Sequence, residues 1–190
     1  MGRNSAWLLL LLALGLLILP IWWVLAAVLA ALWHEGCHYF ALRLVGGQAL
    51  GVRAGLNGAV MVVRFDHPAQ EIICALAGPA GSLLLLLLVR WLPRTAICGG
   101  LQGVYNLLPI FPLDGGRAVR QLSTVYLSSE KAKKLCDFME IACISGIAVL
   151  SLYGYVTLHL GIAPLLVGAG IIWRAKIPCK PWRNSVQWKQ

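Results

Sequence analysis

Apolar residues dominate the chain in long stretches that short polar segments separate. The first stretch covers residues 7–44, which is too long for one transmembrane helix and about right for two, because one span needs about 20 residues. Pro20 interrupts this stretch and Trp22 and Trp23 follow it. Proline breaks helices and tryptophan favours the membrane interface, so we predict a tight turn between two spans at Pro20. A single kinked helix is the competing interpretation.

Four more apolar stretches follow, at residues 69–89, 97–119, 135–155 and 162–173. Pro109 and Pro112 interrupt the second of them, and the last is short for a span. The predicted fold class is therefore an all-α polytopic membrane bundle of about six transmembrane helices. We expect this bundle to occupy residues 1–173 and a basic cytoplasmic tail to occupy residues 174–190.

The pattern changes between residues 46 and 65, just after the second predicted helix. Here Asn57-Gly58 separates two short runs of residues that favour strands, which is a strong signal for a β-hairpin. A two-stranded hairpin alone is only marginally stable. We therefore expect this small hairpin to lean on the helical bundle or on the membrane face.

Composition agrees with a membrane protein. The chain is 59% hydrophobic and 12% charged, with a mean hydropathy of +0.78. An average soluble domain is about half apolar and about one-quarter charged. The six cysteines form no C-x-x-C pair and lie mostly in or beside apolar runs, so we expect neither a disulfide framework nor a zinc finger.

The positive charges predict a topology. The net charge is +9, but the charged residues lie in short segments between apolar runs, so nucleic acid is not an expected partner. With six spans and a cytoplasmic N-terminus, Arg90 and Arg94 are the two positive residues outside, and 14 of the 16 lie inside. This bias follows the positive-inside rule. Both termini are therefore predicted to be cytoplasmic.

The second predicted helix carries His34-Glu35-Gly36-Cys37-His38, which has the H-E-x-x-H spacing. Four residues of α-helix turn about 400°, so the two imidazoles lie about 40° apart and can bind one metal ion. Glu35 beside them can take a proton from an activated water and pass it to a leaving amine. A pair of buried structural histidines is the competing interpretation, but ionisable groups in an apolar membrane segment are usually functional.

A catalytic zinc needs a third protein ligand and an open position. Apart from Glu35, Asp114 is the acidic residue that lies deepest in apolar sequence. Its competing role is that of a buried acid paired with Arg117. His67 and His159 lie in predicted loops and are weaker candidates for the ligand.

Two motifs together, His34-Glu-x-x-His38 and Asn106-x-x-Pro-x-x-Pro-Leu-Asp114-Gly-Gly, resemble those of the site-two protease family of intramembrane zinc metalloproteases. The bacterial stage-four sporulation subgroup looks closest, and the resemblance covers residues 7–173. It implies one zinc ion per chain held by His34, His38 and Asp114, with Glu35 as general base. Asn106 would steady the oxyanion or hold the substrate backbone, unless it is a helix-packing amide.

The resemblance implies hydrolysis of peptide bonds within or near transmembrane segments, as in regulated intramembrane proteolysis. The expected partners are a membrane-anchored substrate protein and the lipid bilayer, in a bacterial cell membrane. The chain shows neither a PDZ-like insertion nor a nucleotide-sensing domain. Control is therefore expected from a membrane partner, or from another protease that trims the substrate first.

Two other functions compete with proteolysis. A proteolytically silent relative would bind transmembrane segments without cutting, but it would have no need of Glu35. An ion transporter would spread polar residues along several helices, whereas here they converge on two motifs.

Three further features fit the resemblance. Gly78-Pro79-Ala80-Gly81-Ser82 resembles the family's G-P-x-x-N/S element, for which we predict helix packing rather than chemistry. Cys37 is interpreted as a packing residue inside the zinc motif. The predicted hairpin occupies the family's place for a strand that pairs with an extended substrate.

Overall fold

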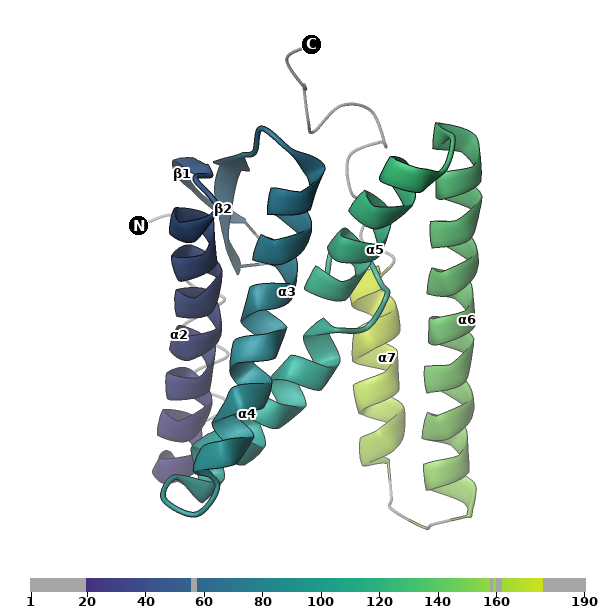
Figure 1. Cartoon of the computed structure of the whole chain (residues 1–190). Coiled ribbons are helices and arrows are strands. Elements are labelled where there is room, and N and C mark those ends of the chain that lie inside the picture. Colours follow the sequence, from purple (N-terminus) through teal and green to yellow (C-terminus); the bar gives the residue numbers. More distant parts are fainter. Residues whose placement is uncertain (1–19, 56–57, 158, 160–161, 176–190) are drawn as a thin grey trace. The chain divides into compact units, whose positions relative to one another are not determined.

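The computed structural model describes residues 20–55, 58–157, 159 and 162–175 (Figure 1). The predicted first span at residues 7–19 and the tail from residue 176 onward lie outside the described residues. The chain divides into two compact units, one of residues 1–106 with 188–190 and the other of residues 107–187. Each unit is described by itself.

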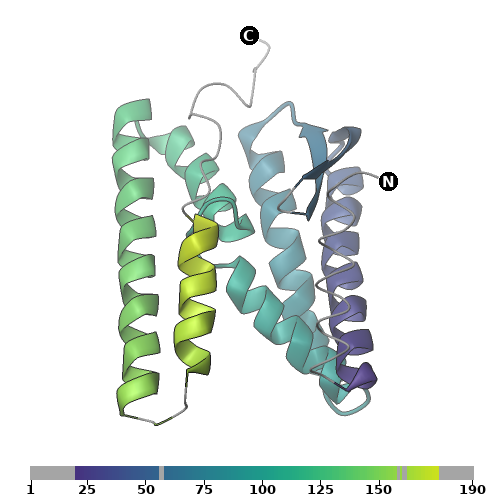
Figure 2. The same cartoon turned by 180° about the vertical axis from the view of Figure 1, so that it is seen from behind.

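Three helices and a hairpin form the described part of the first unit. In chain order its elements are α2 (Ile21–Leu44), β1 (Gln48–Gly55), β2 (Gly58–Arg64), α3 (Pro68–Leu84), the 3₁₀ turn η1 (Leu85–Leu88) and α4 (Pro93–Asn106). The helices α2, α3 and α4 all pack against one another, as Figure 2 shows from behind.

Small residues form the contacts among these three helices. The buried positions include Ala26, Ala30, Cys74, Ala75, Gly78, Gly81, Ser82, Ala96, Gly99, Gly100 and Gly103. The approach is close, because a Cβ added at Gly103 would lie 3.0 Å from the carbonyl oxygen of Pro79. Helices in lipid associate through such small residues, which let the backbones approach.

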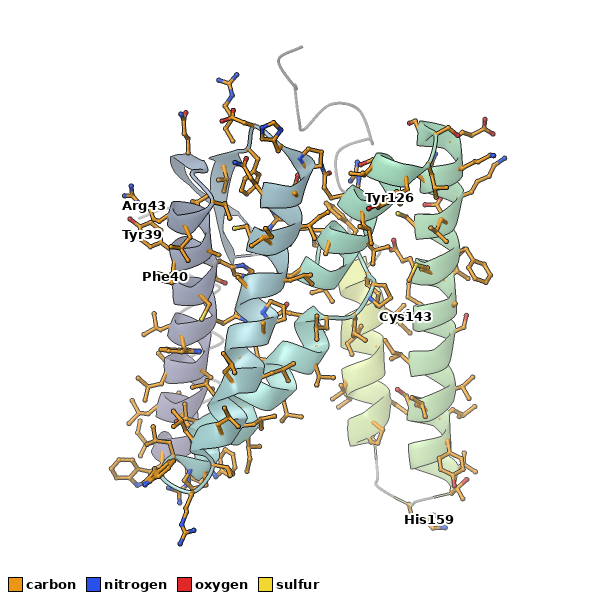
Figure 3. All side chains as sticks on the ribbon, in the orientation of Figure 1. Tyr39, Phe40, Arg43, Tyr126, Cys143 and His159 are labelled. Atoms are coloured by element: carbon orange, nitrogen blue, oxygen red, sulfur yellow. The ribbon has the colours of Figure 1, made fainter. Side chains whose placement is uncertain are left out.

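Large apolar side chains point outward instead. Leu32 and Phe40 on α2 are each 65% exposed, and Leu87 on η1 is 73% exposed. Figure 3 shows Phe40 and Tyr39 projecting away from α2. An apolar exterior around a core of small residues is the pattern expected of helices that face lipid.

The hairpin follows α2, where the predicted hairpin lies. β1 and β2 pair antiparallel, with Val52 opposite Met61 and Gly55 opposite Gly58. Residue 57 of the predicted Asn-Gly turn lies outside the described residues. The base of the hairpin meets the helices in a small apolar cluster formed by Leu42, Phe65 and Cys74. It thus leans on the helices, as a marginally stable hairpin must.

The second unit contains α5 (Asp114–Tyr126), α6 (Ser129–Val156) and α7 (Ala163–Ala175). α6 packs against both α5 and α7, and a Cβ added at Gly168 of α7 would overlap the Ser151 hydroxyl on α6. α6 begins six residues before the predicted residue 135, and its first turns carry an ion pair of 2.9 Å between Glu130 and Lys134.

The predicted span at residues 97–119, which Pro109 and Pro112 interrupt in the sequence, is divided into two helices in the structure. α4 ends at Asn106, α5 begins at Asp114, and residues 107–113 between them form no helix. Pro109 and Pro112 explain the break, since a proline has no N–H to donate and clashes with the preceding turn.

Among the described residues, three helices are long and apolar enough to cross a membrane. They are α2, α3 continued by η1 (residues 68–88), and α6. α4 has 14 residues and α7 has 13, which is short of the roughly 20 that a perpendicular span needs. The count of six spans therefore stays a prediction.

Candidate metal site

Two histidines of α2 point their rings at one place in the first unit. His34 and His38 are one helical turn apart, and their ring centroids lie 4.8 Å from each other with the rings edge to face. The two Nε2 atoms are 3.2 Å apart. His34 lies on the same buried side of α2 as Ala26 and Ala30 and is only 2% exposed. The predicted pairing of the two imidazoles is thus present.

Helix α3 provides a hydrogen-bond partner for the other nitrogen of each ring. His38 Nδ1 lies 2.7 Å from the carbonyl oxygen of Cys74, and His34 Nδ1 lies 2.8 Å from the hydroxyl of Ser82. A carbonyl can only accept, so His38 Nδ1 donates and carries the hydrogen of the neutral ring. Its Nε2 therefore presents a lone pair.

Asn106, the last residue of α4, lies beside His34. Its amide Nδ2 is 3.4 Å from His34 Nε2, and an amide nitrogen can only donate. This contact suits the tautomer in which His34 Nδ1 carries the hydrogen, donates it to Ser82 and leaves Nε2 as the acceptor. The structure thereby brings Asn106 together with the two predicted histidine ligands.

The spacing of the two Nε2 atoms fits a metal ion. Two nitrogens bound tetrahedrally at about 2.0–2.1 Å from zinc lie about 3.3 Å apart. The observed separation is 3.2 Å. The same distance allows a hydrogen bond between the two rings when one Nε2 carries the hydrogen, and a bound metal ion would take the place of that hydrogen. Each Nδ1–H on an acceptor is also the usual arrangement of histidines that bind a metal.

The glycines of α3 make room for this arrangement. A Cβ added at Gly78 would overlap the His38 imidazole, and one added at Gly81 would overlap the Cys37 sulfur. The indole of Trp33 donates a hydrogen bond of 2.8 Å to the Gly81 carbonyl. Cys37 thus packs against α3, in agreement with its predicted role as a packing residue.

Substituting Gly78 is expected to damage the metal site. In Gly78→Ala the new methyl group displaces the His38 ring, and we expect zinc affinity to fall at least about tenfold, the lower end for disturbing a ligand's orientation. Competition with a chromophoric chelator measures this change. Gly146→Ala on α6 is the matched control, because a Cβ there meets nothing within 4 Å. Equal affinities in the two variants would contradict the assigned close contact.

Glu35 follows His34 directly and is exposed, whereas its neighbour is buried. A residue one position along a helix points about 100° away, so Glu35 leaves the packed side of α2. Glu35 therefore lies on the exposed side of α2, one residue after the buried His34.

Asp114 is the first residue of α5, in the second unit. Its side chain is 13% exposed and lies 3.9 Å from Arg117 Nη1, a long ion pair. A Cβ at Gly115 would overlap the Leu107 carbonyl, and one at Gly116 would lie 2.5 Å from the Ile110 carbonyl. The two glycines thus let the preceding segment cross closely over the start of α5.

His67 and His159, the two weaker ligand candidates, lie outside the helix segments that carry the proposed ligands. His67 precedes α3 as its N-cap, and its backbone N–H donates to the Gln70 side chain at 3.1 Å. His159 is exposed between α6 and α7 (Figure 3).

Two partners of the histidines were not predicted from the sequence. Ser82 was assigned to helix packing, and only its place in the glycine-rich element could have suggested more. The Cys74 contact comes from a backbone carbonyl, so the identity of the side chain carries no signal for it.

The fold of the chain is similar to that of a solved structure, the Site-2 Protease from Methanocaldococcus jannaschii. The TM-score is 0.63 and the sequence identity is 19%, over 98% of this chain and 92% of that chain. No protein-family model and no curated protein matches the sequence. The likeness shows the fold and gives no support to the sporulation subgroup.

Proposed function

We propose that the chain is an intramembrane zinc metalloendopeptidase that hydrolyses peptide bonds within or near the transmembrane segments of membrane-anchored proteins. The observation that carries this proposal is the convergence of the His34 and His38 Nε2 atoms at 3.2 Å, on a helix whose exposed Glu35 follows His34 directly. The fold shared with a solved site-2 protease supports it.

Asp114 is the third ligand in this proposal. Two imidazoles and one carboxylate from His34, His38 and Asp114 form a donor set that could hold a metal ion, and the same set occurs at catalytic zinc sites with one position left open.

Glu35 and Asn106 carry the remaining chemistry. A zinc ion bound there would act as a Lewis acid toward the attacking water and the scissile carbonyl. Glu35 accepts the proton of the attacking water and returns it to the leaving amine. The Asn106 amide, whose Nδ2 lies beside His34, donates a hydrogen bond to the oxygen that gains negative charge.

The membrane context determines the class of substrate. The histidine pair lies within α2, one of the three described helices that are able to cross a bilayer. Groups at that depth meet the transmembrane parts of other proteins rather than soluble peptides. We further propose a bacterial cell membrane and several spans, with cytoplasmic termini as the distribution of positive charge favours. A silent relative that binds transmembrane segments is the alternative, and Glu35 argues against it.

Removal of the metal tests the proposal. Purified protein in liposomes with a membrane-anchored reporter is expected to release a soluble fragment, and 1,10-phenanthroline is expected to stop the release. Adding zinc should restore cleavage, since the donor set reloads with the ion. Cleavage that continues in fully zinc-depleted protein would contradict the metalloprotease assignment, while bound reporter without any fragment would favour the silent relative.

A further inference from the structure

We propose that Ser82 is a positioning residue of the metal site, whose hydroxyl fixes the ring orientation and the tautomer of His34. This inference rests on the metal site of the proposed function and assigns α3 a specific role in it. Helix α3 provides the hydrogen-bond acceptors that orient the histidine rings of α2.

The contact between Ser82 and His34 is fully enclosed. Ser82 is 0% exposed and His34 is 2% exposed, and the oxygen-to-nitrogen distance is 2.8 Å. Bulk water has little access to such a buried position, so the Ser82 hydroxyl, and not solvent, meets His34 Nδ1. A buried donor that loses its acceptor costs about 1–3 kcal/mol.

The direction of this hydrogen bond determines which nitrogen can bind metal. A neutral imidazole carries one hydrogen. When Nδ1–H donates to the Ser82 oxygen, Nε2 is left with its lone pair, which also receives the Asn106 amide at 3.4 Å. Without the Ser82 acceptor, the hydrogen can move to Nε2, where it blocks coordination.

The two acceptors of α3 make the rings converge. Ser82 and Cys74 are eight residues apart, or about 12 Å along a helix, whereas His34 and His38 are four residues apart, or about 6 Å. The two acceptors on α3 are thus farther apart than the two histidines on α2. The order is antiparallel, because Ser82 meets His34 and the Cys74 carbonyl meets His38. Each ring is therefore anchored at Nδ1 from outside, and the Nε2 atoms meet between them.

A simple packing role for Ser82 is the competing explanation, and the neighbouring glycines make it a serious one. The hydroxyl can be removed with little change of volume. Ser82→Ala deletes the oxygen, and Ser82→Cys fills the space with a much weaker acceptor. Ser123→Ala is the matched control: Ser123 is also buried, at 5% exposure, but its hydroxyl donates to the Arg120 carbonyl in the second unit.

The test measures zinc affinity by chelator competition, and the visible spectrum of the cobalt-substituted protein as a second readout. We expect Ser82→Ala and Ser82→Cys each to weaken zinc about 10- to 100-fold and to alter the cobalt spectrum, since outer partners of metal ligands commonly have such effects. Ser123→Ala should bind zinc as the wild type does. Circular dichroism and thermal unfolding without metal establish that each variant is folded.

Two results would overturn the inference. Wild-type zinc affinity in folded Ser82→Ala shows that the hydroxyl is dispensable. Full recovery in Ser82→Cys shows that volume, not hydrogen bonding, matters at this position. Zinc affinity is measured without a substrate, so its outcome is separate from that of the protease proposal. If the chain binds zinc in a way that depends on Ser82 but cuts no substrate, only the protease proposal is disproved.

Discussion

Glu35→Gln is expected to reduce cleavage of a membrane-anchored substrate by about 10²–10⁴-fold while the protein keeps its zinc. Glutamine has nearly the same shape as glutamate, but its amide cannot take the proton of the attacking water. Glu35 is exposed and is not one of the proposed ligands, so its loss leaves the histidine pair and the fold as they are. Single-turnover cleavage of the liposome reporter, together with the zinc content of the same sample, measures both effects.

Glu130→Gln is the matched control for this experiment. Glu130 is an exposed acid on α6 that pairs with Lys134, and surface pairs of this kind contribute little to stability. This variant should cut at the wild-type rate. If Glu35→Gln retained more than about one-tenth of wild-type activity, the proton would have to travel by another group, and the assignment of Glu35 as general base would fail.

Loss of any one ligand is expected to empty the site. Wild-type protein should hold one zinc ion per chain, and His34→Ala, His38→Ala and Asp114→Ala should each hold almost none after dialysis, because two remaining ligands rarely retain zinc. Metal analysis of purified, detergent-solubilised protein gives the ratio. Cleavage should fall to the background rate in all three variants.

Asp137→Ala, which removes an exposed acid from α6, serves as the control for Asp114→Ala. The decisive comparison is between His34 and Asp114. If His34→Ala lost zinc and Asp114→Ala kept it, Asp114 would be the structural partner of Arg117, and its effect would appear in thermal unfolding rather than in metal content. The third ligand would then have to be sought elsewhere.

Much of the fold follows from local sequence patterns. Long apolar runs and low charge predicted a membrane protein of helices, and α2, α3 with η1 and α6 correspond to predicted spans. The histidine pair was predictable because helical periodicity alone places i and i+4 on one side. The alignment of His34 with Ala26 and Ala30 follows from the same periodicity.

The errors have a common physical source. Hydropathy does not locate the ends of helices, so the break that Pro109 and Pro112 predict within residues 97–119 has limits, at Asn106 and Asp114, that only the structure gives. Hydropathy also misses helix starts in polar sequence. For this reason the predicted start at residue 135 lies six residues after the observed start of α6 at Ser129. The partners of the histidine Nδ1 atoms depend on how α3 faces α2, and no pattern within one segment encodes that relation.

The close contact between α2 and α3 limits how a substrate could reach the proposed metal site. Gly78 lies against the His38 ring, Gly81 lies against Cys37, and Trp33 is bonded to the α3 backbone. A polypeptide could enter between α2 and α3, along the α2–α3 seam, only by breaking these contacts. Their loss would also change the orientation of both histidine rings. In the proposed protease the entry route therefore avoids the α2–α3 seam and leads to the exposed side of α2 that carries Glu35. A compound that wedges these two helices apart would disrupt the proposed metal site without occupying that exposed side.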